Sequence, residues 1–126
     1  MYLCRRCYIL KTLKDSLARE ALPFRNCTQK VLERISKGRH NPKIRYVVVF
    51  GSEARGEAVL TSDVDIALVS DEPLARDEKL EFAQVFEGVN FPEYRVINTL
   101  TADLDTENFM DVNYHIKRDG VIIYER

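Results

Sequence analysis

The sequence predicts an α/β (α+β) protein in which helices pack on one small mixed sheet. Two observations support this class. Apolar, β-branched segments of strand length recur at residues 43–50, 63–70 and 93–100, and segments with helical spacing of apolar residues lie between them. Because the chain has only 126 residues, we expect one compact domain with one core.

Residues 1–42 are predicted to form an N-terminal helical extension. Apolar residues share one helical face over residues 5–21, namely Leu10, Leu13, Leu17 and Ala21, and Pro23 would end this helix. A second helix is expected from Thr28 to Gly38, with an inner face made of Val31, Leu32 and Ile35. The turn at residues 39–42 then leads into the main domain, residues 43–126.

The main domain is predicted to alternate strands and helices. The continuous apolar run of residues 43–50 is typical of a strand buried on both faces. Further strands are expected at 63–70, 93–100 and 121–125, with helices at 52–59, 73–88 and 106–118. In the helix over 73–88 the inner side is expected to carry Leu80, Phe82, Ala83, Val85 and Phe86.

Composition limits the functional classes. The net charge of −1 gives no overall basic field for nucleic acid, and no apolar run approaches the roughly 20 residues that cross a bilayer. The N-terminus lacks the apolar length and cleavage site of a signal peptide, and an odd number of cysteines favours a reducing compartment. We therefore expect a cytoplasmic protein without membrane contact.

Cys4 and Cys7 form a CxxC pair that leaves several interpretations open. Zinc would need two more ligands, for which only Cys27, His40 and His115 are candidates. Plain thiols on an N-terminal helix are the simpler interpretation, and a redox pair would normally follow a strand.

The segment FGSEARGEAVLTSDVDIALV, residues 50–69, carries the chemistry. Asp63 and Asp65 are two residues apart at the start of a strand, so their side chains should share one face. Two neighbouring carboxylates repel each other unless a cation lies between them, and Mg²⁺ suits such a pair. The alternative is a turn in which the aspartates only accept hydrogen bonds.

The first half of this segment fits a phosphate site. Gly51 allows backbone N–H groups to approach a ligand, and Ser52 adds a hydroxyl at a helix start. Arg55 could face an anion or form a structural ion pair, and Gly51-Ser52 could be a simple strand-to-helix turn. Together with the aspartates, these residues suggest a site for a metal-bound nucleoside triphosphate.

The motif GS-x-ARG followed by SD-x-D resembles the signature of the DNA polymerase beta-like nucleotidyltransferase superfamily. In length the chain resembles its minimal members, which often pair with an all-helical HEPN-type protein as toxin and antitoxin. The resemblance implies a polymerase beta palm-like fold, in which Gly51 and Ser52 bind the triphosphate of ATP and Asp63 and Asp65 hold Mg²⁺. The implied reaction transfers a nucleoside monophosphate, such as AMP, to a hydroxyl of a protein or RNA.

The sequence departs from the family at one position. Members usually supply a third carboxylate from the next long strand, but here the aligned residue in EYRVIN is Arg95. Glu93 lies two residues earlier on the same strand face and could replace the missing ligand. Arg95 could instead pair with Asp63 or Asp65, or bind phosphate. We predict that it points toward the two aspartates.

Two functions therefore stay open from the sequence. The first is a Mg²⁺-dependent nucleotidyltransferase, and the second is a catalytically weakened module that binds a nucleotide or a HEPN-type partner. Basic residues of the extension could contact RNA or simply face solvent, namely Arg5, Arg6, Lys11 and Lys14. A homo-oligomer is also compatible with the sequence.

Overall fold

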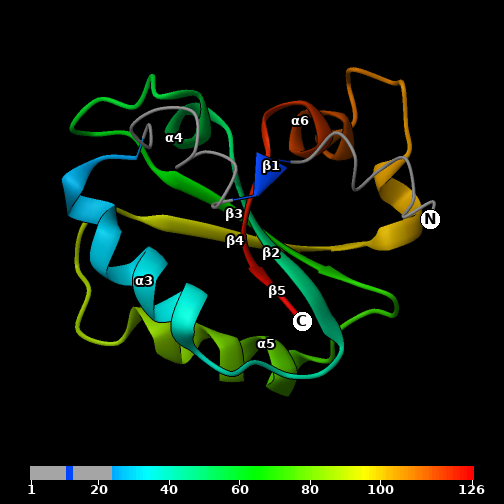
Figure 1. The fold of residues 1–126 in the computed structure, drawn as a ribbon, viewed down its shortest axis with the longest axis horizontal. Coiled ribbons are helices and arrows are strands. Elements are labelled where there is room, and N and C mark those ends of the chain that lie inside the picture. Colours follow the sequence, from blue (N-terminus) through cyan, green and yellow to red (C-terminus); the bar gives the residue numbers. More distant parts are fainter. Residues whose placement is uncertain (1–10, 13–23) are drawn as a thin grey trace.

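The computed structural model describes residues 11–12 and 24–126, and its centre is a five-stranded mixed sheet (Figure 1). The strands are β1 (Lys11–Thr12), β2 (Ile44–Phe50), β3 (Val64–Ser70), β4 (Tyr94–Leu100) and β5 (Val121–Glu125). Their order is β1-β5-β2-β3-β4, in which β1/β5 and β3/β4 are parallel and the other pairs are antiparallel. The predicted fold class is confirmed.

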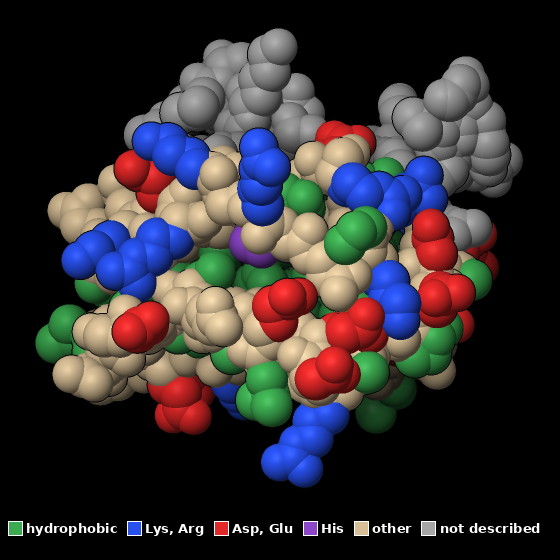
Figure 2. Space-filling view, turned by 90° about the horizontal axis from the view of Figure 1, so that it is seen from below, with side chains coloured by type: hydrophobic (Ala, Val, Ile, Leu, Met, Phe, Trp, Pro, Cys, Tyr) green, Lys and Arg blue, Asp and Glu red, His purple; other side chains and the backbone are tan. Residues whose placement is uncertain are grey.

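Helices lie on both sides of this sheet (Figure 1). They are α3 (Gln29–Lys37), α4 (Ser52–Arg55), α5 (Arg76–Phe82) and α6 (Val112–Asp119). Short 3₁₀ segments precede α3 at Asn26–Thr28, continue α5 at Ala83–Phe86 and follow β4 at Thr101–Leu104. Helices α3 and α5 lie on one side and α6 on the other, and α4 follows the end of β2, where Ala54 packs into the core cluster of α3. Over the outer face on the α3 and α5 side, Lys and Arg side chains are interspersed with Asp and Glu side chains (Figure 2).

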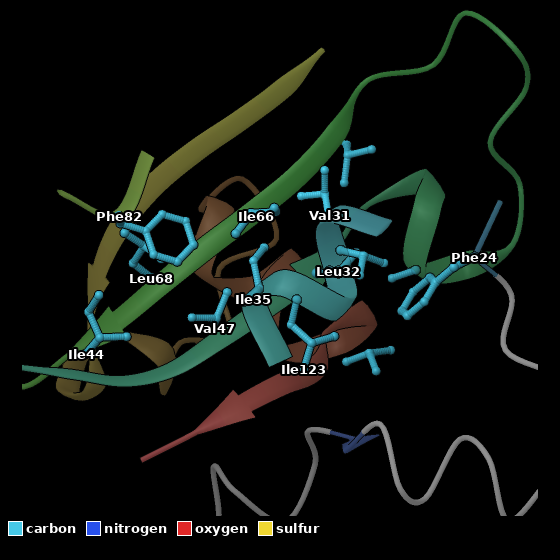
Figure 3. Close-up of a cluster of buried hydrophobic side chains, with 14 of the residues drawn as sticks. Phe24, Val31, Leu32, Ile35, Ile44, Val47, Ile66, Leu68, Phe82 and Ile123 are labelled. Atoms are coloured by element: carbon cyan, nitrogen blue, oxygen red, sulfur yellow. The ribbon is translucent and has the colours of Figure 1, made fainter. Parts of the chain in front are cut away.

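The core has two parts because both faces of the central strands are covered. Between the sheet and α3, alternate residues of β2 and β3 pack with Leu32 and Ile35, including Val47, Val49, Ile66 and Leu68 (Figure 3). On the opposite face the other residues of these strands pack with Ile116 of α6, including Val48, Phe50, Ala67 and Val69. This double burial explains the uninterrupted apolar runs of β2 and β3.

Helix α3 belongs to the main core although we place it in the N-terminal extension. The predicted inner residues Val31, Leu32 and Ile35 are all buried there. This packing agrees with one compact domain, whereas the predicted boundary after residue 42 remains a proposal.

Three predicted helices are shorter in the structure. The helix expected over 52–59 ends at Arg55, because Gly56 takes a left-handed conformation (φ +74°) and its N–H bonds back to the last turn. The helix expected over 106–118 begins only at Val112, where the carboxylate of Asp111 caps it by accepting from the backbone N–H of Asn113 at 2.9 Å.

The helix expected over 73–88 divides into α5 and a 3₁₀ segment that begins at Ala83. Phe82 is buried, and Val85 and Phe86 pack against the core as predicted. Leu80 is 60% exposed and Ala83 is also exposed, so their predicted burial is wrong. Residues two apart on an α-helix face different sides, so Leu80 points away from the side on which Phe82 is buried, and the 3₁₀ winding that begins at Ala83 changes the side-chain spacing there.

The predicted N-terminal helix over 5–21 lies outside the described residues, apart from Lys11 and Thr12. These two residues pair with Val121 and Ile122 of β5, so a continuous helix through them is wrong. Strand β5 offers unpaired backbone groups on that side, and an extended segment satisfies them. Cys4 and Cys7 also lie outside the described residues. No helix in the described part is long and apolar enough to span a membrane.

Candidate functional site

The two halves of the sequence motif meet where β2 ends and β3 begins. Because these strands are antiparallel, Phe50 pairs with Asp65, and Gly51 follows directly. Gly51 has φ +75°, and a Cβ atom at this position would lie only 2.5 Å from Oδ2 of Asp65. Glycine is therefore required here for both its conformation and the closeness of the carboxylate.

Asp63 and Asp65 converge on Arg95. Nε of Arg95 lies 3.5 Å from Oδ2 of Asp63 and 3.3 Å from Oδ1 of Asp65. Asp65 and Arg95 are direct partners in the parallel pairing of β3 and β4. The prediction that Arg95 points toward both aspartates is confirmed, and one guanidinium now neutralises part of their charge.

The pKa of Asp65 is raised above its ordinary value. Partial burial is the main cause, because it disfavours the ionised form, and the negative charge of Asp63 acts in the same direction. The positive charge of Arg95 opposes both effects without cancelling them. Burial and the charge of Asp63 together therefore outweigh the stabilisation of the Asp65 carboxylate by Arg95.

An open depression of about 480 Å³ adjoins this pair. Four of the predicted site residues line it, namely Gly51, Ser52, Arg55 and Asp65. The described residues that line it do not include Asp63, Glu93 or Arg95. Glu93 is exposed, and its carbonyl accepts a hydrogen bond from the N–H of Val64 at 2.9 Å.

Helix α6 contributes lining residues that the sequence analysis missed. Val112, His115 and Arg118 are spaced by three residues, so they lie on one face of α6, and all three line the depression. The spacing shows from the sequence that these residues share a helix face. Only the packing of α6 against the sheet shows that this face meets the site.

Arg55 is held by two carboxylates. Its Nη1 donates to Oδ2 of Asp119 at 2.8 Å and its Nε donates to Oε1 of Glu57 at 2.9 Å. Burial alone would raise the pKa of Asp119, but hydrogen bonds from Arg118 and Arg55 hold it below its ordinary value. Asp119 is therefore an ionised carboxylate that joins α4 to the end of α6.

Glu53 is a further residue that the sequence analysis missed. It is fully buried inside the GSEAR segment, where its carboxylate accepts from the backbone N–H of Arg25 at 2.7 Å, from Nε of Arg25 at 2.6 Å and from the hydroxyl of Thr28 at 3.2 Å. A buried carboxylate is stable only with such partners. Glu53 thus ties α4, which carries Ser52, to the residues before α3.

Mg²⁺ is the metal that the motif implies, and the residues fit one such ion better than two. Oxygens of Asp63 and Asp65 approach a common point, now close to Nε of Arg95, and two carboxylates plus phosphate oxygens suit Mg²⁺. Arg95, whose side chain is 63% exposed, has room to move aside. A second ion would need another carboxylate, and the register position beside Asp65 holds Arg95 instead.

The candidate zinc ligands do not converge within the described part of the chain. Cys27 is exposed, whereas ring nitrogens of His40 and His115 are engaged with the carbonyls of Ile35 and Phe109 at 2.8 and 2.9 Å. Among the described residues, no three His, Cys, Asp or Glu side chains are grouped so that they could hold a metal ion.

Comparison with known proteins agrees with this geometry. Residues 33–126 match the family described as "Polymerase beta, Nucleotidyltransferase". No curated protein has a significant match to this chain. The fold is similar to a solved structure described as a toxin-antitoxin with AMP-PNP, with 20% identity, a TM-score of 0.50, and coverage of 80% of this chain and 73% of that one.

A second solved structure is described as "a putative nucleotidyltransferase from Sulfolobus solfataricus". It has 20% identity and a TM-score of 0.47, and the match covers 79% of this chain and 78% of the other. The family match spans most of the sequence, including both halves of the motif. This chain therefore belongs to the polymerase beta nucleotidyltransferase family.

Proposed function

We propose that this protein binds a nucleoside triphosphate, with ATP as the first candidate, and transfers its nucleoside monophosphate to a hydroxyl group of a protein or an RNA. One observation carries the proposal: Gly51, Ser52 and Arg55, from the turn after β2 and from α4, line one depression together with Asp65 of β3. A general nucleotidyltransferase role follows from the family, whereas ATP, Mg²⁺ and the acceptor are our proposals.

Each residue has a physical role in this proposal. Gly51 allows the turn with φ +75° that brings Ser52 to the depression, the hydroxyl of Ser52 would donate a hydrogen bond to phosphate, and Arg55 would contribute positive charge. Asp63 and Asp65 would hold Mg²⁺, which when bound neutralises phosphate charge. The acceptor hydroxyl gives up its proton to water, its oxygen bonds to the α-phosphorus, the bond from that phosphorus to the bridging oxygen breaks, and pyrophosphate leaves.

The contact of Arg95 with both aspartates favours a second candidate function. A cation at this position competes with a metal ion for the same oxygens and cannot act as a ligand. The protein would then be a nucleotide-binding module with weak chemistry, or none, that acts through a partner. Glu93 remains a proposed substitute ligand.

The proposed partners are a second protein and RNA. One similar structure is a toxin-antitoxin crystallised with AMP-PNP, so we propose a partner protein of the HEPN type and a cytoplasmic location. The face shown in Figure 2 has no continuous basic surface among its described residues, which gives RNA binding no support there. The basic extension residues that could contact RNA, and a homo-oligomer, remain proposals.

The test uses the full chain with labelled ATP, Mg²⁺ and the product of the adjacent gene. Transfer of label to that protein or to RNA supports the enzyme, whereas ATP binding without transfer supports the module. The double variant Asp63→Asn/Asp65→Asn should lose Mg²⁺-dependent ATP binding and keep its fold. The control is Asp77→Asn/Asp103→Asn, which removes the same charge from exposed positions. Equal ATP affinity in both variants would refute the metal role of Asp63 and Asp65.

A further inference from the structure

A pair of arginines forms one side of the depression. Arg55 follows the glycine-serine turn and Arg118 lies in the last turn of α6, and both line the depression with Ser52 and Asp65. Helix α4 has only four residues, so its dipole adds little positive charge near Ser52. The charge available to an anion on this side therefore comes from the two guanidinium groups.

Asp119 holds the two arginines together. Its Oδ2 accepts from Nη1 of Arg55 at 2.8 Å and from Nη2 of Arg118 at 3.0 Å, and its Oδ1 accepts from Nε of Arg118 at 2.9 Å. The side chain of Asp119 is only 6% exposed, whereas those of Arg55 and Arg118 are 37% and 50% exposed. A buried carboxylate thus fixes two guanidinium groups that still reach solvent.

Both arginines keep donors for a ligand. A guanidinium has five N–H donors, and the bonds to described residues use two in each case. Glu57, which accepts from Arg55, is 64% exposed and can be replaced by another anion at little cost. Arg118 also lies over the ring of Tyr114, 5.8 Å from its centroid, which restricts its position further.

We propose that Arg55 and Arg118, positioned by Asp119, form a clamp for the polyphosphate of the bound nucleotide. The proposal rests on the proposed function, because it assigns the triphosphate to this side of the same depression. Two forked guanidinium groups match several phosphate groups better than one, because each can donate two parallel hydrogen bonds to phosphate oxygens. The clamp should therefore distinguish nucleotides by their number of phosphates.

The test is calorimetric titration of the full chain with ATP, AMP and inorganic tripolyphosphate in the presence of Mg²⁺. Arg118→Gln should weaken the binding of ATP and tripolyphosphate by about tenfold or more, as expected for lost charged hydrogen bonds, and change AMP binding by less than about twofold. Asp119→Asn should also lower the preference for ATP over AMP, because Asp119 acts on the ligand only by positioning the two arginines. Arg118→Lys should recover part of the ATP affinity.

Arg45→Gln is the matched control. Arg45 is 43% exposed and pairs with Asp71 at 3.1 Å, at the opposite end of β2 from Gly51, so its loss should leave ATP binding unchanged. Unchanged ATP affinity in Arg118→Gln, or equal losses for ATP and AMP in a folded variant, would overturn the clamp. If the wild type does not bind ATP, the proposed function itself fails. It fails as well if Ser52→Ala and Asp65→Asn both bind ATP with the wild-type affinity. If Ser52→Ala and Asp65→Asn lose ATP affinity but Arg118→Gln does not, the proposed function stands without the clamp.

Discussion

Asp65 on β3 and Arg95 on β4 lie side by side as register partners, with 3.3 Å between Oδ1 of the carboxylate and Nε of the guanidinium. The same nitrogen lies 3.5 Å from Asp63. A cation from the protein thus stands beside the two carboxylates that the motif assigns to a metal ion.

Replacing Arg95 with aspartate should strengthen Mg²⁺ binding and raise nucleotidyl transfer. The change removes a competing cation and adds a carboxylate beside Asp65, where the family usually has its third ligand. Mg²⁺ titration and AMP incorporation would measure both effects. Arg95→Gln is the control, because it removes the charge without adding a ligand and should give a smaller gain. High wild-type turnover that collapses in Arg95→Asp would mean that Arg95 takes part in catalysis.

Gly51→Ala should destabilise the protein by about 2–4 kcal/mol, because alanine is strained at φ +75° and its Cβ would meet Oδ2 of Asp65. Gly88→Ala is a matched control. Gly88 has φ +77° with nothing within 4 Å of an added Cβ, so the cost should be about 1 kcal/mol. Urea unfolding measures both. Equal losses would mean that the carboxylate of Asp65 moves away easily.

Asp65→Asn should gain stability relative to the wild type as the pH rises. Because the folded-state pKa of Asp65 lies above its ordinary value of 3.8, its favourable contribution is complete below 3.8 and is lost as the pH rises through the folded pKa. The variant cannot ionise there, so its Tm relative to wild type should increase between pH 3 and pH 7. Asp103→Asn, at an exposed position, is the control for the loss of one charge. A difference in Tm that falls with pH would show that pairing with Arg95 outweighs burial.

Glu53→Gln should reduce the free energy of unfolding by about 3 kcal/mol, because it leaves the guanidinium of Arg25 without its buried carboxylate. Chemical denaturation would measure this loss. In the control, Glu33→Gln breaks an exposed pair with Lys37 and should cost less than about 0.5 kcal/mol. A loss for Glu53→Gln no larger than that of the control would mean that the ion pair with Arg25 adds little to stability.

The strands and the motif could be predicted from the sequence because their signals are local. The apolar runs over β2 and β3 reflect burial on both faces, and the spacing of Asp63 and Asp65 places both side chains on one face of the chain. The side-chain direction of Arg95 could be predicted in the same way, because successive side chains of a strand point to opposite faces. Helix ends were predicted less accurately. They depend on the conformation of single residues, here the left-handed Gly56 after α4 and the cap Asp111 before α6.

The sequence by itself therefore determined the fold class, the family and the residues of the glycine-serine and aspartate motif. Only the tertiary structure decided which distant groups meet them. The register of β3 and β4 placed Arg95 against Asp65, and the packing of α6 brought Asp119 to Arg55, 64 residues away. Glu53 met Arg25 in the same way. Such pairs depend on long-range packing, which periodicity within one element does not encode, because it specifies only which face of that element is buried.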